Sequence, residues 1–188
     1  MTDILQKRVI VEEDPATAEA ELLALPGLKK YSASLKTDKE KGDFRAHLRR
    51  YVNIYLADCP FEVSTTNRYT VVTEEAAVTA RRYIKKGETV KYLCGVQVHM
   101  TEDEEEFIKS SRRDFSIVVS GRSGTASLFL GPARFANHDC DANARLNPTG
   151  NNGMAIVACK NIDEGEEVTV SYGTIHALLL ISFLSNIS

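Results

Sequence analysis

This sequence has few cysteines, and they are spread too widely to build a site together. They stand singly at Cys59, Cys94, Cys140 and Cys159, and no C-x-x-C pair occurs. This spacing argues against a disulfide framework and against a self-contained zinc site. We therefore expect a reducing, intracellular environment for the chain.

Long hydrophobic segments are also missing from the sequence. The longest apolar run covers residues 177–184 and is far shorter than the ~20 residues that a membrane-spanning helix needs. The first residues lack the hydrophobic core of a signal peptide. We expect the protein to have no membrane partner.

An excess of charge of one sign is missing as well. Charged residues make up 26% of the 188 residues and hydrophobic residues 43%, and the net charge is −3. This balance is typical of an ordinary globular chain that folds around one hydrophobic core. Because a mildly acidic protein has no bulk attraction for a polyanion, we expect no direct sequence-specific binding of nucleic acid.

The remaining features divide the chain into a helical region, residues 1–60, and a strand-rich part. Asp14-Pro15 is typical of a helix start, and Leu25-Pro26-Gly27 is typical of its end. A second helix is expected from about Asp43. Its apolar residues recur at helical spacing and predict one buried face: Phe44, Leu48, Tyr51 and Tyr55. The arginines on the other side are interpreted as a solvated face: Arg45, Arg49 and Arg50.

From Phe61 onward the pattern changes to short strands and turns. Strands are predicted at residues 69–72, 77–80, 89–98, 116–120, 126–130, 154–160 and 167–172. Asn152-Gly153 predicts a hairpin turn. One helix interrupts the strands, because Thr101 and Glu104 match a capping box. The predicted fold class is therefore mostly β with an N-terminal helical region.

An internal repeat links two distant parts of the strand-rich region. Residues 80–90, with the sequence ARRYIKKGETV, match residues 158–168, ACKNIDEGEEV, at a constant spacing of 78 residues. Each copy predicts a strand, a turn containing Gly-Glu and a second strand. Two copies are too few for a solenoid, so we expect two related half-sheets in one compact β domain.

Polar and reactive side chains crowd one short segment, residues 135–143, with the sequence FANHDCDAN. Asn137 and His138 offer donors and acceptors that suit the edge of an adenine and the amino-acid end of a cofactor. A metal site would need further ligands, and a nucleophile made of Cys140 and His138 would need an oxyanion hole that no motif marks. A polar knot that satisfies buried backbone groups is the structural alternative.

The order of the neighbouring motifs carries a family resemblance. Gly131-Pro132 precedes the polar segment, and Gly165-Glu166-Glu167 and Tyr172 follow it. This ordered set resembles the signature of SET-domain lysine methyltransferases. Residues 128–140, LFLGPARFANHDC, together with Arg68-Tyr69 and Asp114-Phe115-Ser116, are similar to the fungal histone H4 lysine 20 methyltransferases. The resemblance implies a SET domain over residues 61–173, built as a β-clip of short strands with a C-terminal pseudoknot.

The same resemblance implies an activity and its residues. The activity is the transfer of methyl groups from S-adenosylmethionine to a histone lysine, lysine 20 of histone H4, with nucleosomes as partner and chromatin in the nucleus as location. Tyr172 is the implied catalytic residue, and Phe115 and Ser116 are implied to line the substrate channel. The implied cofactor contacts are Tyr69, Thr70, Ala76, Arg122, Asn137 and His138. Taken singly, three of these have plain structural interpretations: Tyr69 as a core aromatic, Thr70 as a strand residue and Arg122 as a turn residue.

The sequence is expected to depart from this family at both ends. The family's helical region extends further upstream, and after the position of Gly173 the family has cysteines that bind zinc together with the position of Cys140. Residues 174–188 contain no cysteine, so Cys140 is expected to bind metal only where those cysteines are present, and we expect no zinc here. Residues 174–188 are expected to lie outside the fold. The alternative function is a catalytically inactive SET fragment, either a chromatin-binding module or the product of a truncated gene model.

Overall fold

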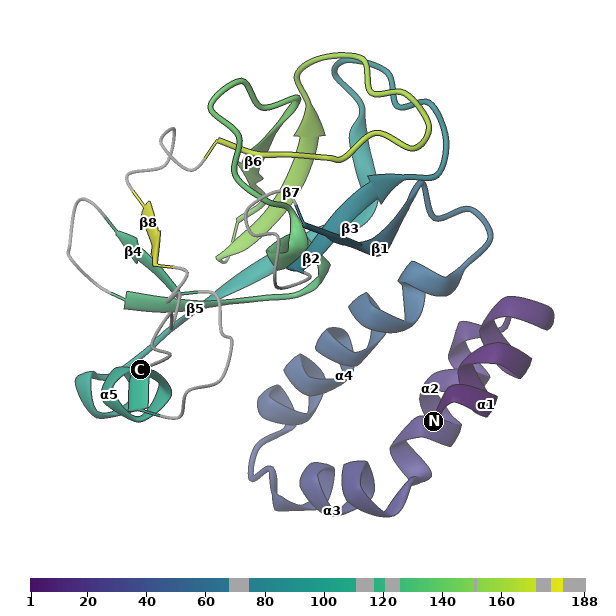
Figure 1. The fold of residues 1–188 in the computed structure, drawn as a ribbon. Coiled ribbons are helices and arrows are strands. Elements are labelled where there is room, and N and C mark those ends of the chain that lie inside the picture. Colours follow the sequence, from purple (N-terminus) through teal and green to yellow (C-terminus); the bar gives the residue numbers. More distant parts are fainter. Residues whose placement is uncertain (68–74, 111–116, 121–125, 151, 172–176, 181–188) are drawn as a thin grey trace.

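The computed structural model describes the chain except for residues 68–74, 111–116, 121–125, 151, 172–176 and 181–188. Helices come first and strands follow (Figure 1). The helices are α1 (Thr2–Ile4), the π-helix η1 (Leu5–Val11), α2 (Pro15–Ala24), α3 (Pro26–Ser34), α4 (Asp38–Val52), η2 (Asn53–Tyr55), α5 (Glu102–Ser110) and η3 (Pro132–Phe135). The strands are β1 (Phe61–Thr66), β2 (Glu75–Ala80), β3 (Thr89–His99), β4 (Ile117–Ser120), β5 (Ala126–Leu130), β6 (Ala144–Pro148), β7 (Gly153–Ala158) and β8 (Ala177–Leu180). The predicted fold class is confirmed.

The strands form two antiparallel sheets. One contains β1 and β2, and the other has the order β6-β7-β3-β5-β4-β8. The predicted hairpin at Asn152-Gly153 is confirmed, because β6 and β7 pair directly on either side of it. The capping box before α5 is confirmed as well, since Thr101 N–H donates to Glu104 Oε2 at 2.8 Å and Glu104 N–H donates to Thr101 Oγ1 at 3.3 Å.

The helix α2 begins where the Asp14-Pro15 pattern predicts. The Asp14 carboxylate accepts hydrogen bonds from the hydroxyl of Thr17 at 2.6 Å and from its N–H at 3.0 Å. The second bond satisfies a backbone donor that a helix start leaves unpaired. Because both bonds favour the ionised form, they hold the pKa of Asp14 below its usual value, with the hydroxyl bond as the larger cause.

Two expectations for α4 are wrong. The helix begins at Asp38 rather than Asp43, after a capping box in which the Glu40 N–H donates to Thr37 Oγ1 at 3.1 Å. The expected stripe is also not one buried face, because Tyr55 is 43% exposed while Val52, outside the stripe, is buried. Figure 1 shows that α4 lies between α2 and the strand-rich part, and Leu48 and Val52 pack in the hydrophobic cluster that α4 shares with α2.

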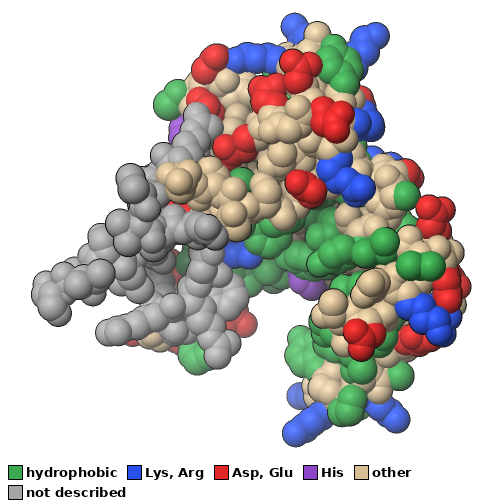
Figure 2. All heavy atoms as spheres, turned by 45° about the vertical axis from the view of Figure 1, so that its right-hand side comes forward, with side chains coloured by type: hydrophobic (Ala, Val, Ile, Leu, Met, Phe, Trp, Pro, Cys, Tyr) green, Lys and Arg blue, Asp and Glu red, His purple; other side chains and the backbone are tan. Residues whose placement is uncertain are grey.

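The expectation of one hydrophobic core is also wrong, since the buried side chains of the described residues form two clusters. The smaller cluster joins α4 to η1 and α2 and contains Val9, Ala18, Leu22 and Val52. The larger cluster fills the strand-rich part and includes Phe61, Ile84, Leu93, Ile156 and Ile162. Figure 2 shows hydrophobic side chains between these two parts, while acidic and basic side chains are interspersed on the outer surface.

The internal repeat is built into the fold as an exchange of backbone hydrogen bonds. The Gly87 N–H of the first copy donates to Ala158 O of the second at 2.9 Å, and the equivalent Gly165 N–H donates to Ala80 O at 2.8 Å. The two glycines have φ angles of +87° and +83°, which favour glycine over any residue with a Cβ. The two copies are therefore bonded to each other through their turns.

The C-terminal part differs from the predicted strand pattern. Of the predicted strand 167–172, the described residues form only isolated bridges at Glu167 and Val170, so a regular strand there is wrong. Within residues 174–188, β8 pairs antiparallel with β4 at the edge of the larger sheet. The domain boundaries at residues 60 and 173 stay predictions. Among the described residues, no helix combines the length and apolar character needed to cross a membrane.

Candidate functional site

The candidate site is organised by a segment that lies between two other parts of the chain. Residues 166–170 are bonded on one side by Asn137, whose carbonyl accepts from Val170 N–H at 2.9 Å. On the other side Ala144 N–H donates to Thr169 O at 3.0 Å. Both contacts belong to parallel bridges, which pair Val170 with His138 and with Ala144. The C-terminal segment therefore passes between two stretches of one loop, which is the arrangement expected for the pseudoknot.

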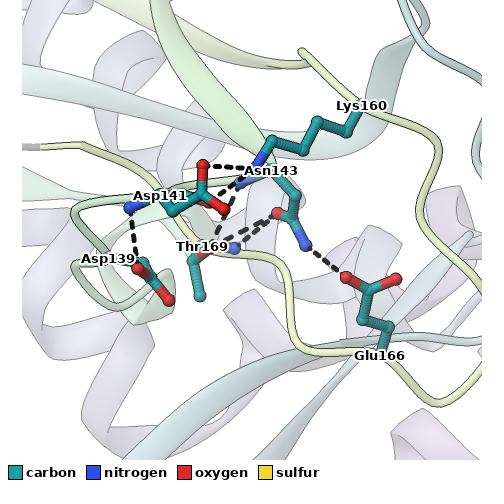
Figure 3. Close-up of polar contacts among 6 residues, drawn as sticks. All are labelled: Asp139, Asp141, Asn143, Lys160, Glu166 and Thr169. Carbon is teal, nitrogen blue, oxygen red and sulfur yellow. Dashed lines mark hydrogen bonds and ion pairs between the residues drawn. The ribbon is translucent and has the colours of Figure 1, made fainter.

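Asn143 holds this segment on one side through hydrogen bonds from both ends of its side-chain amide (Figure 3). Its Oδ1 accepts from the Thr169 N–H at 2.9 Å. Its Nδ2 donates to Glu166 Oε1 at 3.0 Å and to the carbonyl of Glu167 at 2.8 Å. Because Asn143 is only 7% exposed, these bonds also satisfy a buried polar group that would otherwise be costly. This part of the motif is a structural clamp.

Asn137 lies on the other side of the segment and uses its amide differently. Its Nδ2 donates to Ala76 O in β2 at 3.1 Å and to Glu167 Oε1 at 2.9 Å. No described residue donates to its Oδ1, and the residue as a whole is 8% exposed. Two predicted cofactor contacts, Ala76 and Asn137, are thus brought together.

His138 and the acidic residues after it form the exposed side of the loop. The Nε2 of His138 lies 3.6 Å from Cys140 Sγ. The Asp141 N–H donates to Asp139 Oδ1 at 2.9 Å, and Lys160 Nζ contacts Asp141 Oδ1 at 2.6 Å (Figure 3). These bonds shape the tight turn that carries the chain from Asn137 to Asn143.

A glycine directs the chain into this loop. Gly131 has a φ of +102°, and a Cβ there would lie 2.7 Å from the carbonyl oxygen of Cys94. Both facts require glycine, because the backbone conformation is unfavourable for other residues and the backbone neighbour cannot move aside. The short helix η3 follows and leads directly to Ala136 and Asn137.

The described part of the chain offers little for a metal ion. No group of three or more His, Cys, Asp or Glu side chains converges within the described residues. Cys140 is exposed, and all four cysteines are free thiols. Burial raises the pKa of the Cys59 and Cys94 thiols, so these two are unlike the activated thiols of catalytic sites.

The remaining predicted site residues lie outside the described residues: Tyr69, Thr70, Phe115, Ser116, Arg122 and Tyr172. Sequence reasoning missed three residues that build the site, namely Asn143, Glu167 and Thr169. The second glutamate of Gly165-Glu166-Glu167 was visible as part of a motif, but its partner, Asn137, is 30 positions away. A cavity of about 320 Å³ between α2 and α4, lined in part by Glu19 and Arg49, is separate from this site.

The comparison with protein families agrees with this geometry. Residues 75–173 match the SET domain, which is just over half of the 188 residues. The match includes β2, the polar loop and the segment that passes through it. The chain belongs to the SET-domain family.

Three similar fungal proteins are named histone-lysine N-methyltransferases. The chain is 58% identical over 172 residues to set9 of Neurospora crassa, covering 92% of this chain and 22% of that protein. It is 61% identical over 173 residues to SET9 of Gibberella zeae, covering 92% of this chain and 26% of that protein. It is 59% identical over 170 residues to SET9 of Phaeosphaeria nodorum, covering 90% of this chain and 26% of that protein. The chain therefore spans about a quarter of the length of these relatives.

Proposed function

We propose that this chain is the SET domain of a histone-lysine methyltransferase that transfers methyl groups from S-adenosylmethionine to lysine 20 of histone H4. The observation that carries the proposal is the Asn137 amide, whose Nδ2 is fully bonded inside the protein while its Oδ1 has no described partner. The fungal relatives support the reaction through their names and their identity of 58–61%. The choice of lysine 20 of histone H4 rests on the family resemblance of Arg68-Tyr69, Asp114-Phe115-Ser116 and residues 128–140.

The residues present fit a cofactor with a polar, hydrogen-bonding end. The Asn137 Oδ1 is the acceptor available to such a group, on a residue that is 8% exposed. Bound S-adenosylmethionine supplies a methyl group activated by a cationic sulfur. We propose that Asn137 and His138 hold it together with Ala76, Tyr69, Thr70 and Arg122.

Tyr172 follows Val170 by two residues in the sequence. The Val170 N–H is bonded to the Asn137 carbonyl at 2.9 Å. We propose that the phenol of Tyr172 orients the amine of the substrate lysine. Such positioning supplies a large part of a transfer rate.

The proposal includes the partner and the cellular location. Histone H4 in nucleosomes would be the substrate, with Phe115 and Ser116 lining the lysine channel, and chromatin in the nucleus would be the place of action. Cys140 would take part in a zinc site only with cysteines from outside this sequence. Its exposure leaves it accessible to such a segment.

Calorimetric titration of S-adenosylmethionine into the 188-residue chain tests the cofactor part of this proposal. We expect saturable binding at one site, and we expect His138→Ala to weaken it at least tenfold. Lys86→Ala, a change on the exposed turn of the first repeat copy, serves as the control and should bind as the unchanged chain does. Absence of binding by a folded chain would contradict the proposal and favour an inactive SET module.

A further inference from the structure

We infer that Glu167 is a positioning residue, whose carboxylate fixes the Asn137 amide so that the amide oxygen faces the cofactor. The inference rests on the proposed function, because it takes Asn137 to be a cofactor contact. Glu167 belongs to the segment that passes through the knot, and its Oε1 accepts from Asn137 Nδ2 at 2.9 Å. It would act through Asn137 and would not touch the reacting atoms.

The chemistry of the two neighbours decides which way the amide points. Asn137 Nδ2 lies 3.1 Å from the carbonyl oxygen of Ala76 and 2.9 Å from Glu167 Oε1. A carbonyl and an ionised carboxylate accept hydrogen bonds and have no hydrogen to donate. The reversed amide would place its oxygen against two acceptors, so only one orientation is stable. Ala76 and Glu167 together therefore favour the orientation in which an acceptor, and not a donor, remains available.

The second asparagine of the loop provides a contrast. Asn143 uses both ends of its amide inside the protein, since its Oδ1 accepts from Thr169 N–H and its Nδ2 donates to Glu166. In the described residues, the only buried side-chain nitrogen or oxygen without a partner is His47 Nδ1. The Asn137 Oδ1 is therefore not sealed in the interior. Asn143 holds the knot, whereas Asn137 also presents an acceptor at its surface.

The internal repeat shows that the carboxylate at position 167 is not a requirement of the fold. Glu88 and Glu166 occupy the same position in the two copies, and each accepts from a backbone N–H three residues earlier, at 3.2 Å and 2.9 Å. At the next position the copies differ, because the first has Thr89 and the second has Glu167. The first copy forms the same turn without a carboxylate there. The carboxylate of Glu167 is therefore not needed for the turn, and its bond to Asn137 is a contact that the first copy lacks.

The test compares the affinity of S-adenosylmethionine for variants of the 188-residue chain by calorimetry. Glu167→Leu removes the acceptor, and we expect its Kd to rise about tenfold, the loss of one hydrogen bond made by a charged group. Glu167→Gln keeps an accepting oxygen, and its Kd should stay within about threefold of the unchanged chain. Glu166→Leu is the matched control. It removes a carboxylate from the clamp around Asn143, so it should lower the melting temperature and leave the Kd unchanged.

The outcomes separate this inference from the proposed function. If the unchanged chain does not bind S-adenosylmethionine, the proposed function is wrong and the inference falls with it. If the unchanged chain binds and Glu167→Leu binds equally well, the inference alone is wrong. Equal weakening by Glu166→Leu and Glu167→Leu would also overturn it, because both residues would then act only through the stability of the knot.

A second pair of variants keeps the test decisive if Glu167→Leu does not fold. Asn137→Asp puts a carboxylate beside that of Glu167, and repulsion between like charges should abolish measurable binding. Adding Glu167→Gln removes the repulsion and supplies a donor, so it should restore part of the affinity. Such coupling is expected only for residues in direct contact. Failure of Glu167→Gln to restore any affinity would contradict the inference.

Discussion

Ile84 and Ile162 donate their backbone N–H groups to each other's carbonyl oxygens, and both bonds measure 2.9 Å. The two residues occupy the same position in the two copies of the internal repeat, and both side chains are fully buried. A reciprocal pair of this kind is the hydrogen-bonded pair of an antiparallel ladder. Since the second copy leads into residues 166–170, this pair ties the first copy to the knot that carries Asn137.

The turns of the two copies should be equally sensitive to a side chain. Gly87→Ala and Gly165→Ala place a Cβ at φ angles of +87° and +83°, which costs about 1 kcal/mol each through backbone strain alone. No atom lies within 4 Å of either added Cβ, so no steric clash adds to this. Urea unfolding should show the two losses to be equal within error.

Gly42→Ala is the matched control for these glycines. Gly42 lies inside α4, and an added Cβ there also meets nothing within 4 Å. Its backbone is helical, so alanine should raise the free energy of unfolding by about 0.5–1 kcal/mol. A loss of stability in Gly42→Ala, or none in Gly165→Ala, would contradict the assignment of strain to the turns.

The ion pair between Glu19 and Arg49 should matter more than others on the helices. Glu19 is 8% exposed, and both of its carboxylate oxygens accept from the Arg49 guanidinium. Arg49→Ala leaves this carboxylate without its main partner and should lower the midpoint of urea unfolding measurably. Lys39→Ala breaks the exposed pair with Asp43 and should leave that midpoint nearly unchanged. Equal shifts of the midpoint would contradict this account.

The Asp14 cap of α2 should make the free energy of unfolding depend on pH. The hydrogen bonds from Thr17 lower the pKa of Asp14 in the folded chain. The ionised carboxylate therefore makes its full contribution to the free energy of unfolding above the unfolded pKa of about 3.9. This contribution is lost as the pH falls through the lower, folded pKa. Asp14→Asn keeps an oxygen for the Thr17 N–H but loses the charge, so it should be less stable than the unchanged chain at pH 7. Below pH 4 the unchanged chain should lose more stability than the variant, as urea unfolding at both pH values would reveal.

Tyr172→Phe should separate catalysis from binding. Removal of the phenol oxygen is expected to lower the rate of methyl transfer by at least about 100-fold, the usual scale for a group that orients or exchanges protons with the reactants. The Kd for S-adenosylmethionine and the melting temperature should stay unchanged. Tyr83→Phe, an exposed tyrosine in the first repeat copy, is the control. Near-normal turnover by Tyr172→Phe would refute the assignment of this residue.

Local signals in the sequence predicted those features that depend on neighbouring residues. The start of α2 at Asp14-Pro15 and the capping box at Thr101 were predicted correctly because each cap is made within four residues. The start of α4 was missed, although Thr37 and Glu40 form the same type of box, because the apolar pattern begins later in the helix. The helix start was therefore placed by the apolar pattern, although the capping box at Thr37 and Glu40 marks the true start.

Features that depend on distant contacts were not predictable in this way. The packing of Leu48 and Val52 with η1 and α2, and the separation of the buried side chains into two clusters, depend on contacts between distant parts of the chain. The bond between Asn143 and Glu166 joins residues 23 positions apart and exists only because one segment passes through a loop. Only the family resemblance predicted this knot, and it identified Asn137 without its partner Glu167.

Mass spectrometry of histone H4 tests the central claim most directly, after recombinant nucleosomes have been incubated with the chain and S-adenosylmethionine. The account predicts methyl groups on lysine 20, and none on nucleosomes in which arginine replaces that lysine. Tyr172→Phe should reduce the signal to a small fraction. A folded chain that binds the cofactor and leaves lysine 20 unmethylated would contradict the claim.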